Sequence, residues 1–198
     1  MKPDDYLKWI CSSQTDQELQ GNYDQWASTY ESDIAQFWET VPHTAATALS
    51  KFLPNKQASI LDFGAGTGMV GVALAQLGFK HIIGLDISPG MLEQAQQKRV
   101  YQALVCGAIA DENLESLGNI TGVIATGVFA ERHAGEAELK AVHTKLQPGG
   151  VFVFTVRQGF LAQLQPMLNQ TVWTPLSSEV MQIYDDPMHL LAYRKTAQ

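Results

Sequence analysis

A glycine-rich turn between an apolar run and an amphipathic run is the feature that most constrains the fold of this chain. Residues 59–63 form a short apolar run typical of a buried strand, and Gly64, Gly66 and Gly68 follow directly. Apolar residues then recur at helical spacing, at Met69, Val70, Ala73, Leu74 and Leu77. Glycine adopts positive φ and lets a ligand approach the backbone. The segment therefore predicts a strand, a turn and a helix, with a binding site at the turn.

Short apolar runs and amphipathic stretches continue to alternate after the turn, which is typical of βα units around a parallel sheet. Further strands are expected at residues 81–86, 101–106, 120–126 and 151–156. A helix is expected from Pro89 to about Lys98, with Ser88 as its N-cap. Another is expected around Leu139, Val142 and Leu146, ended by Pro148, Gly149 and Gly150. One more helix and a hairpin of residues 178–184 and 188–193 complete the predicted order.

The first 55 residues are rich in aromatic side chains and precede every strand-like run. We expect two or three helices there, and the last should end at residue 52 because Leu53 precedes Pro54. Tyr23, Trp26 and Tyr30 are spaced i, i+3 and i+7, so on one helix they would form a single aromatic face. Such a face fits either a packed core or a site for a positively charged ligand, because aromatic rings attract cations.

The composition indicates one folded domain without a polyanionic partner. The chain has 198 residues, of which 45% are hydrophobic and 17% charged. The formal net charge is −7 and basic residues do not cluster, so nucleic-acid binding is not expected. Cys11 and Cys106 belong to no CxxC motif, and no segment resembles a signal peptide or a membrane span. We therefore expect a cytoplasmic protein with reduced thiols and no membrane partner.

An acidic residue follows the second predicted strand at the position where nucleoside cofactors are often held. Asp86 lies 20 residues after Gly66 and can accept hydrogen bonds from both ribose hydroxyls. The alternative is that Asp86 caps the following helix. A dinucleotide fingerprint would place a third glycine where Met69 stands, and no Tyr-x-x-x-Lys pair follows the fourth strand. Both observations disfavour a nucleotide-dependent oxidoreductase, which remains the rival enzyme class.

Three motifs occur in a fixed order: LDFGAGTG at residues 61–68, GLDIS at 84–88 and LQPGGVFVF at 146–154. In this order they resemble the S-adenosylmethionine-dependent methyltransferases of the Rossmann-like class I. Residues 23–30, 104–108 and 126–129 are most similar to the branch of the Williams-Beuren syndrome region methyltransferase. The resemblance implies an α/β, three-layer Rossmann-like fold with a seven-stranded, mostly parallel sheet and an antiparallel last strand. It also implies one domain over residues 1–198, with residues 1–55 as a helical lid and 56–198 as the core.

The resemblance further implies S-adenosylmethionine as cofactor and S-adenosylhomocysteine as product. Asp62 would orient the glycine loop at the methionine end, Asp86 would hold the ribose, and Ile87 and Met91 would enclose the adenine. The expected cofactor contacts are Tyr23, Trp26, Tyr30, Asp62, Gly64, Ala65, Gly66, Gly68, Asp86, Ile87, Met91, Ala108, Ile109 and Thr126. Many relatives carry an aspartate where Ala108 stands, so either backbone groups recognise the adenine or Asp111 reaches back to it.

The loop after the fourth strand lies where acceptors bind in open α/β sheets. Glu131 and His133 in this loop are the candidates for removing a proton from the acceptor, and the alternative is that they form a solvated turn. No carboxylate cluster suggests a metal. The expected function is methyl transfer to a small molecule whose identity the sequence does not reveal. The alternative outside catalysis is a module that binds S-adenosylmethionine without turnover.

Overall fold

The computed structural model describes residues 3–110, 117–170 and 173–196. The helices within these ranges are α1 (Pro3–Ile10), α2 (Asp16–Trp26), α3 (Tyr30–Trp38), α4 (Val41–Phe52), α5 (Met69–Gln76), α6 (Pro89–Lys98), α7 (Glu136–Lys145) and α8 (Gln158–Gln170). The strands are β1 (Ser59–Phe63), β2 (His81–Asp86), β3 (Ala103–Cys106), β4 (Ile120–Phe129), β5 (Leu146–Arg157), β6 (Trp173–Met181) and β7 (Met188–Lys195).

The strands form one seven-stranded sheet in the order β3-β2-β1-β4-β5-β7-β6. The pairings among β1 to β5 are parallel, whereas β7 is antiparallel to both β5 and β6. The last strand is thus inserted between β5 and β6 and runs antiparallel to both, as the resemblance implies. The predicted class, a mostly parallel sheet of seven strands with an antiparallel last strand, is confirmed.

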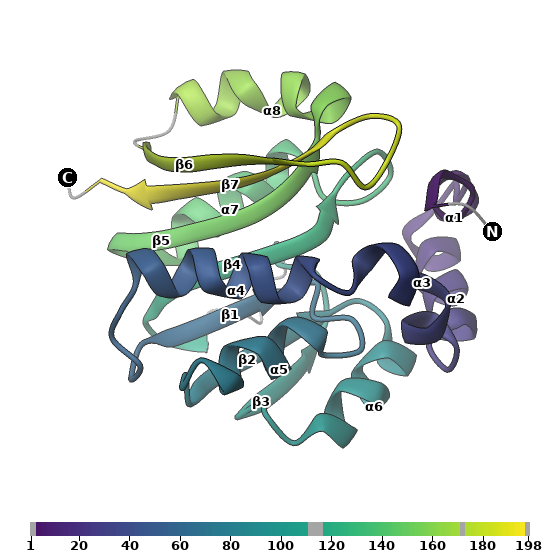
Figure 1. The fold of residues 1–198 in the computed structure, drawn as a ribbon, viewed down its shortest axis with the longest axis horizontal. Coiled ribbons are helices and arrows are strands. Elements are labelled where there is room, and N and C mark those ends of the chain that lie inside the picture. Colours follow the sequence, from purple (N-terminus) through teal and green to yellow (C-terminus); the bar gives the residue numbers. More distant parts are fainter. Residues whose placement is uncertain (1–2, 111–116, 171–172, 197–198) are drawn as a thin grey trace.

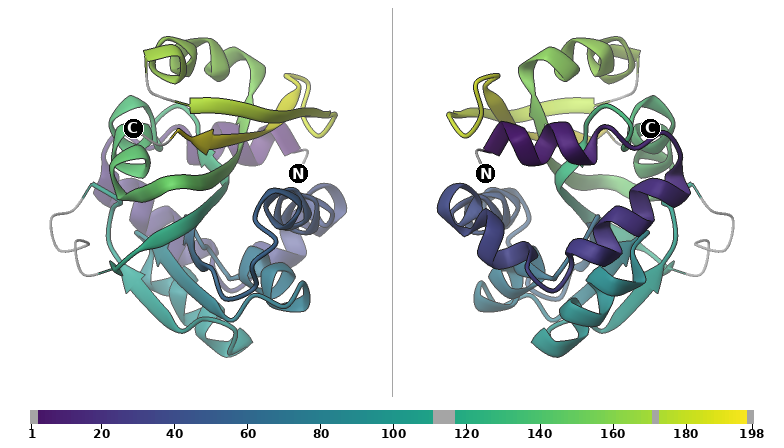
Figure 2. Two further views of the ribbon diagram at one scale, coloured as in Figure 1. Left: turned by 90° about the vertical axis from the view of Figure 1, so that its left-hand side faces the viewer. Right: turned by 90° about the vertical axis from the view of Figure 1, so that its right-hand side faces the viewer.

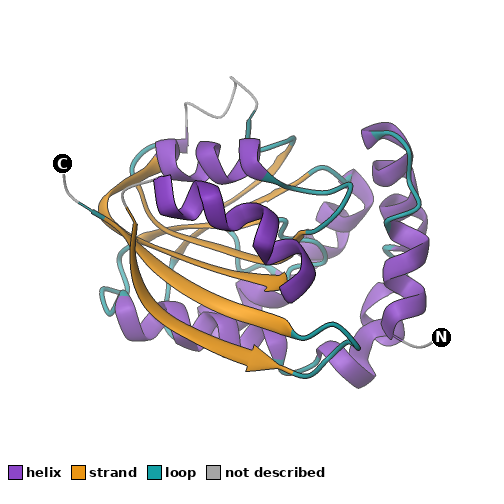
Figure 3. Ribbon diagram, turned by 90° about the horizontal axis from the view of Figure 1, so that it is seen from above, coloured by secondary structure: helices purple, strands orange, loops and turns teal. Residues whose placement is uncertain are grey.

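Helices cover both faces of the sheet and make it the middle of three layers (Figure 3). Alternate residues of β5 point to opposite faces. Phe152 and Phe154 pack in one cluster with residues of α7 and α8, whereas Val151 and Val153 pack in another with α4 and α5. Because both faces are buried, the inner strands are apolar almost throughout. This double burial is the physical reason for the unbroken apolar runs in the sequence.

The helices α1, α2 and α3 lie together at one end of the sheet, beyond the carboxyl ends of the parallel strands (Figures 1 and 2). They share a separate apolar cluster that includes Ile10, Leu19, Ile34 and Trp38. With α4 there are four helices in the described part of the first 55 residues, whereas the sequence predicted two or three. Short polar breaks separate them, and Thr15 caps α2 by accepting from the Glu18 N–H.

The prediction that three aromatic residues share one helix face is wrong. Tyr23 and Trp26 lie on α2, but α2 ends at Trp26 and Tyr30 begins α3. The three residues still meet because the chain turns between the helices. The ring centroids of Trp26 and Tyr30 lie 4.7 Å apart, and those of Tyr23 and Trp26 lie 6.4 Å apart. The aromatic cluster is therefore formed by tertiary packing between two helices.

Several predicted boundaries also differ from the structure. The third strand begins at residue 103 rather than 101, and the fourth extends to Phe129 rather than 126. Leu146 was expected on a helix but begins β5, where it pairs with Ile120. The hairpin strand β6 ends at residue 181, before the predicted end at 184. None of the helices in the described ranges has both the length and the apolar character needed to cross a membrane.

Candidate functional site

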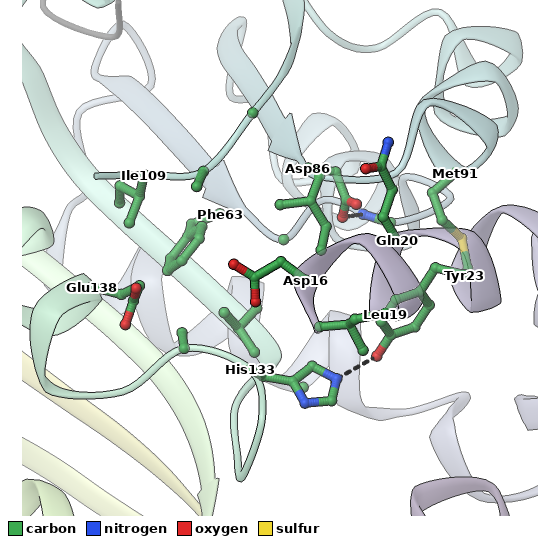
Figure 4. A pocket seen from close by; sticks show the side chains of 18 of the residues that line it. Asp16, Leu19, Gln20, Tyr23, Phe63, Asp86, Met91, Ile109, His133 and Glu138 are labelled. Atoms are coloured by element: carbon green, nitrogen blue, oxygen red, sulfur yellow. Dashed lines mark hydrogen bonds between the residues drawn. The ribbon is translucent and has the colours of Figure 1, made fainter. Parts of the chain in front are cut away.

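A cavity of about 470 Å³ lies at the carboxyl ends of β1 to β4, with α2 along one side (Figure 4). Open α/β sheets bind ligands at this edge, and the volume suits one drug-sized ligand. The predicted site residues that line it are Tyr23, Tyr30, Gly64, Gly66, Asp86, Ile87, Met91, Ala108, Ile109, Thr126 and His133. The structure thus brings together residues from α2, α3, the turns after β1, β2 and β3, the strand β4 and the β4–α7 loop.

The glycine turn requires glycine for two different reasons. Gly64, Gly66 and Gly68 have φ values of +71°, +53° and +92°, which disfavour other residues. A Cβ on Gly64 would overlap the side chain of Val128, so the turn packs against the end of β4. A Cβ on Gly66 would meet nothing within 4 Å, so this backbone faces open space at the cavity. Gly66 therefore leaves room for a ligand beside the chain.

Asp86 connects the glycine turn to the second strand. Its Oδ2 accepts the Gly66 N–H at 2.8 Å, and its Oδ1 accepts the Ser88 N–H at 2.9 Å. Burial raises the pKa of Asp86, and these two hydrogen bonds oppose the shift. Each carboxylate oxygen has a second lone pair, so Asp86 can still accept from ligand hydroxyls. The cap of α6 is Ser88 itself, whose Oγ accepts the Met91 N–H at 3.0 Å.

Four of the expected cofactor contacts do not line the cavity. Asp62 is fully buried beneath the glycine turn, and Ala65 and Trp26 are also buried. A Cβ on Gly68 would approach the Ala95 backbone at 3.1 Å, so Gly68 is a packing position. Trp26 instead donates from Nε1 to Asp33 at 2.8 Å. Any effect of these residues on a ligand would act through the residues that line the cavity.

His133 enters the cavity from the β4–α7 loop, whereas the Glu131 side chain is exposed and is not among the residues that line it. The Glu131 carbonyl lies 3.0 Å from His133 Nδ1, and the Tyr23 hydroxyl lies 2.9 Å from Nε2. Because a carbonyl oxygen only accepts, Nδ1 carries the proton and Nε2 accepts from Tyr23. Burial lowers the pKa of His133, which favours the neutral ring. The two catalytic candidates thus have different environments.

The helix α2 is also attached to α6 on the other side of the cavity. Asp24 Oδ1 accepts from the Ser88 hydroxyl at 2.6 Å and from the Gly90 N–H at 2.9 Å. Glu31 at the start of α3 forms an ion pair with Lys98 at the end of α6, with an N–O distance of 2.9 Å. The N-terminal helices are therefore held on α6 by polar contacts as well as by packing.

Sequence reasoning missed several residues that line the cavity, notably Asp16, Gln20, Arg132 and Glu138. Asp16 and Gln20 belong to α2, and Glu138 lies in the first turn of α7, where it accepts the Gly135 N–H at 2.7 Å. The Asp16 side chain points into the cavity (Figure 4). Asp16, Gln20 and Glu138 each have an ordinary helical or capping explanation in the sequence, and Arg132 lies in the β4–α7 loop, so no local signal marked them.

Two further expectations concern adenine recognition and metal binding. Asp111, which was considered as an adenine contact, lies outside the described residues. Across the described ranges, no group of three or more His, Cys, Asp or Glu side chains gathers as a metal site would require.

Comparison with known sequences identifies relatives of the chain. The family model described as a methyltransferase domain matches residues 37–188. Methyltransferase-like protein 27 of Homo sapiens is 36% identical over 138 residues, which cover 68% of this chain and 56% of that protein. An uncharacterized methyltransferase of Oceanobacillus iheyensis is 29% identical over 138 residues, covering 67% of this chain and 63% of that protein. The chain thus covers less than two thirds of the length of either relative.

Comparison with solved structures supports the fold. The putative methyltransferase in complex with the Haloferax volcanii Trm112 methyltransferase activator superposes with a TM-score of 0.69 at 17% identity, covering 88% of this chain and 98% of that one. Magnesium protoporphyrin IX methyltransferase of Synechocystis PCC 6803 with bound S-adenosylhomocysteine superposes with a TM-score of 0.65 at 16% identity, covering 81% and 85%. The resemblance predicted from the sequence, including the Williams-Beuren branch of Methyltransferase-like protein 27, is confirmed.

Proposed function

The chain belongs to the methyltransferase domain family, and from this premise we propose that it transfers a methyl group from S-adenosylmethionine to a small molecule bound beside His133. The observation that carries the proposal is one cavity that joins the glycine turn and Asp86 to the Tyr23–His133 pair. Donor and acceptor must lie next to each other for an in-line displacement. A continuous cavity of this size satisfies that requirement.

The residues at the turn fit the proposed cofactor. Gly66 leaves open space beside its backbone, and Asp86 keeps acceptor capacity for the ribose hydroxyls. Ile87 and Met91 on one side and Ala108 and Ile109 on the other would enclose the adenine. S-adenosylmethionine, when bound, supplies a methyl group on a positively charged sulfur. Tyr23 and Tyr30 would cover that end of the cofactor, and their aromatic faces suit a cation.

The Tyr23–His133 pair would remove a proton from the acceptor. His133 is neutral, and its Nε2 accepts the hydrogen bond from Tyr23. An O–H or N–H group of the methyl-accepting molecule can therefore pass its proton to the Tyr23 oxygen while the Tyr23 proton moves to Nε2. The Glu131 carbonyl would hold the ring in the required tautomer. In this proposal His133 is the base, Tyr23 relays the proton, and Glu131 acts through its backbone.

The charge of the cavity bears on the acceptor. Of the described residues that line it, Asp16, Asp86 and Glu138 carry negative charge and Arg132 carries positive charge. A strongly anionic acceptor, such as a nucleic acid, would be repelled. We therefore favour a neutral or positively charged small molecule. Of residues 1–55, we propose α1 to α3 as the lid over it, since α4 packs on the sheet.

Calorimetric titration with S-adenosylmethionine, S-adenosylhomocysteine and NAD in parallel tests the cofactor. We expect both adenosyl ligands to bind and NAD not to bind. Asp86→Ala should weaken binding by at least about 2 kcal/mol, because charge-assisted hydrogen bonds to the ribose are lost. Glu179→Ala, an exposed acid on β6, is the matched control and should leave the affinity unchanged. Binding of NAD alone, or equal affinities of Asp86→Ala and the control, would refute the cofactor assignment.

A second experiment tests transfer. The purified protein is incubated with radiolabelled S-adenosylmethionine and separate fractions of small metabolites, proteins and RNA. We expect label in the small-molecule fraction and a loss of at least about 100-fold in rate for His133→Asn with cofactor affinity unchanged. Label in protein or RNA would contradict the acceptor class. Tight cofactor binding without label in any fraction would favour the non-catalytic binding module.

A further inference from the structure

Tyr101 reaches the base of the glycine turn through a gap that three glycines leave open. Its hydroxyl donates a hydrogen bond of 2.6 Å to Oδ2 of Asp62. A Cβ on Gly71 would overlap the Tyr101 ring, and Cβ atoms on Gly84 and Gly68 would lie 3.0 and 3.1 Å from it. The gap lies between the start of α5 and the middle of β2. These glycines make room for the tyrosine ring, and this packing role is unrelated to a dinucleotide fingerprint.

The acceptor of this hydrogen bond is a carboxylate with no access to water. Asp62 is 0% exposed and lies two residues before Gly64 in β1. Burial raises the pKa of Asp62 to about 7, while the Tyr101 hydrogen bond acts in the opposite direction. Whether Asp62 is charged near neutral pH therefore depends on the Tyr101 hydroxyl.

Few titratable groups act on Asp62 from the surrounding elements. Among the described residues they are Tyr101, which precedes β3, and Asp86 at the end of β2, whose charge raises the pKa of Asp62. The α5 helix contributes the Gly71 amide, which favours the ionised form. The glycine turn thus lies between two carboxylates, Asp62 below it and Asp86 beside it, where a positively charged ligand would be stabilised.

We propose that Tyr101 is a positioning residue for the cofactor, whose hydrogen bond to Asp62 favours a carboxylate beneath the glycine turn, so that the turn attracts the ammonium-bearing end of the adenosyl ligand. This proposal rests on the proposed function and deepens it. A purely structural role, in which the ring only fills the gap, would leave the pH dependence of ligand binding unchanged when the hydroxyl is removed. The pH profile therefore distinguishes the two roles.

The test compares the wild-type protein with Tyr101→Phe, which keeps the ring and removes the hydroxyl. The Asp62 carboxyl is titrated by carbon NMR without ligand, and S-adenosylhomocysteine affinity is measured by calorimetry at several pH values. We expect Tyr101→Phe to bind about tenfold more weakly at about pH 7 and within about twofold of wild type at about pH 9. Tyr193→Phe, half-buried in β7, is the matched control and should follow the wild-type profile.

A double-mutant cycle with Asp62→Asn strengthens the test, because the amide carries no charge. In the Asp62→Asn background, Tyr101→Phe should change the affinity less than about twofold at every pH. The proposal is overturned if the Asp62 pKa is the same in Tyr101→Phe, or if it rises while the affinity profile stays superimposable on wild type. If wild-type protein binds neither adenosyl ligand, the proposed function fails first, and the positioning role fails with it.

Discussion

The helix α2 is held on the two sides of the cavity by contacts of different kinds. On the α6 side, the Asp24 carboxylate accepts two hydrogen bonds at the N-terminus of α6. Glu31 of α3 pairs with Lys98 at the other end of α6. On the opposite side, one hydrogen bond joins the Tyr23 hydroxyl to His133. A carboxylate at a helix N-terminus is favoured by charge and dipole, whereas the tyrosine–histidine hydrogen bond joins two neutral groups. The first side therefore acts as an anchor and the second as a releasable contact.

This difference indicates where the lid would open. The releasable contact lies at His133, on the side where the proposed acceptor binds, and the anchor lies beside the proposed cofactor site. A lid that opens on the acceptor side would let the methyl acceptor exchange while the cofactor stays bound.

Asp24→Ala should have the largest effect, because it leaves the Ser88 hydroxyl and the Gly90 N–H without their partner. We expect a loss of about 2 kcal/mol in the free energy of unfolding and faster hydrogen exchange of the α2 amides. Chemical denaturation and exchange mass spectrometry measure these effects. Gln25→Ala, the exposed neighbour, should change stability by less than about 0.5 kcal/mol. Equal changes in stability and in α2 exchange for the two variants would show that Asp24 does not anchor α2.

Tyr23→Phe should have a smaller and more local effect. Loss of one neutral hydrogen bond costs about 1 kcal/mol. We expect exchange to accelerate in α2 while the amides of α6 keep their protection and the affinity for S-adenosylhomocysteine stays unchanged. Exchange mass spectrometry and calorimetry measure the two effects. If α6 loses protection together with α2, then the Tyr23–His133 contact and the Asp24 contact with α6 do not act independently.

The same contact predicts a pH dependence. Burial lowers the pKa of His133 in the folded protein, so the unfolded chain binds the proton more readily. The contribution of His133 to stability is complete above about pH 6.5 and is lost as the pH falls below that value. The free energy of unfolding, compared at about pH 8 and about pH 5, should fall more in wild type than in His133→Asn. Removal of the exposed His43, as His43→Asn, should leave the wild-type pH profile intact.

Lys98→Ala should have the smallest effect. The Lys98–Glu31 pair is about one third exposed on each side, and exposed ion pairs contribute little because water and salt screen them. We expect a change below about 0.5 kcal/mol that disappears at high salt. A larger, salt-independent loss would show that the ion pair, and not Asp24 alone, holds the N-terminal helices on α6.

Elements with complete local signals were predicted accurately. β1 and β2 match residues 59–63 and 81–86, because each apolar run is bounded by glycine or a polar turn. The start of α6 was predicted because Ser88 accepts the Met91 N–H and Pro89 fits the first helical position. Boundaries failed where pairing with a distant strand decided them, as at Leu146, which pairs with Ile120.

Some residues of the cavity were predicted from the sequence and others were not. The glycine turn, Asp86 and His133 were found from motifs and from their place after predicted strands, and each lines the cavity. The prediction that Tyr23, Trp26 and Tyr30 share one helix face was wrong because residue spacing does not reveal the helix break at residues 27–29. Asp16 and Glu138 were missed because each looks like an ordinary helix-start residue until the helices converge on the cavity.

The sequence by itself determined the alternation of strands and helices, the turn that requires glycine, and the acidic residue after the second strand, since these depend on burial pattern and backbone φ along a local stretch. Only the tertiary structure decided that Tyr23 meets His133 and that Tyr101 meets Asp62, pairs separated by 110 and 39 residues. Contacts at such separations depend on how the layers pack, because no local pattern encodes which distant side chain fills a given gap.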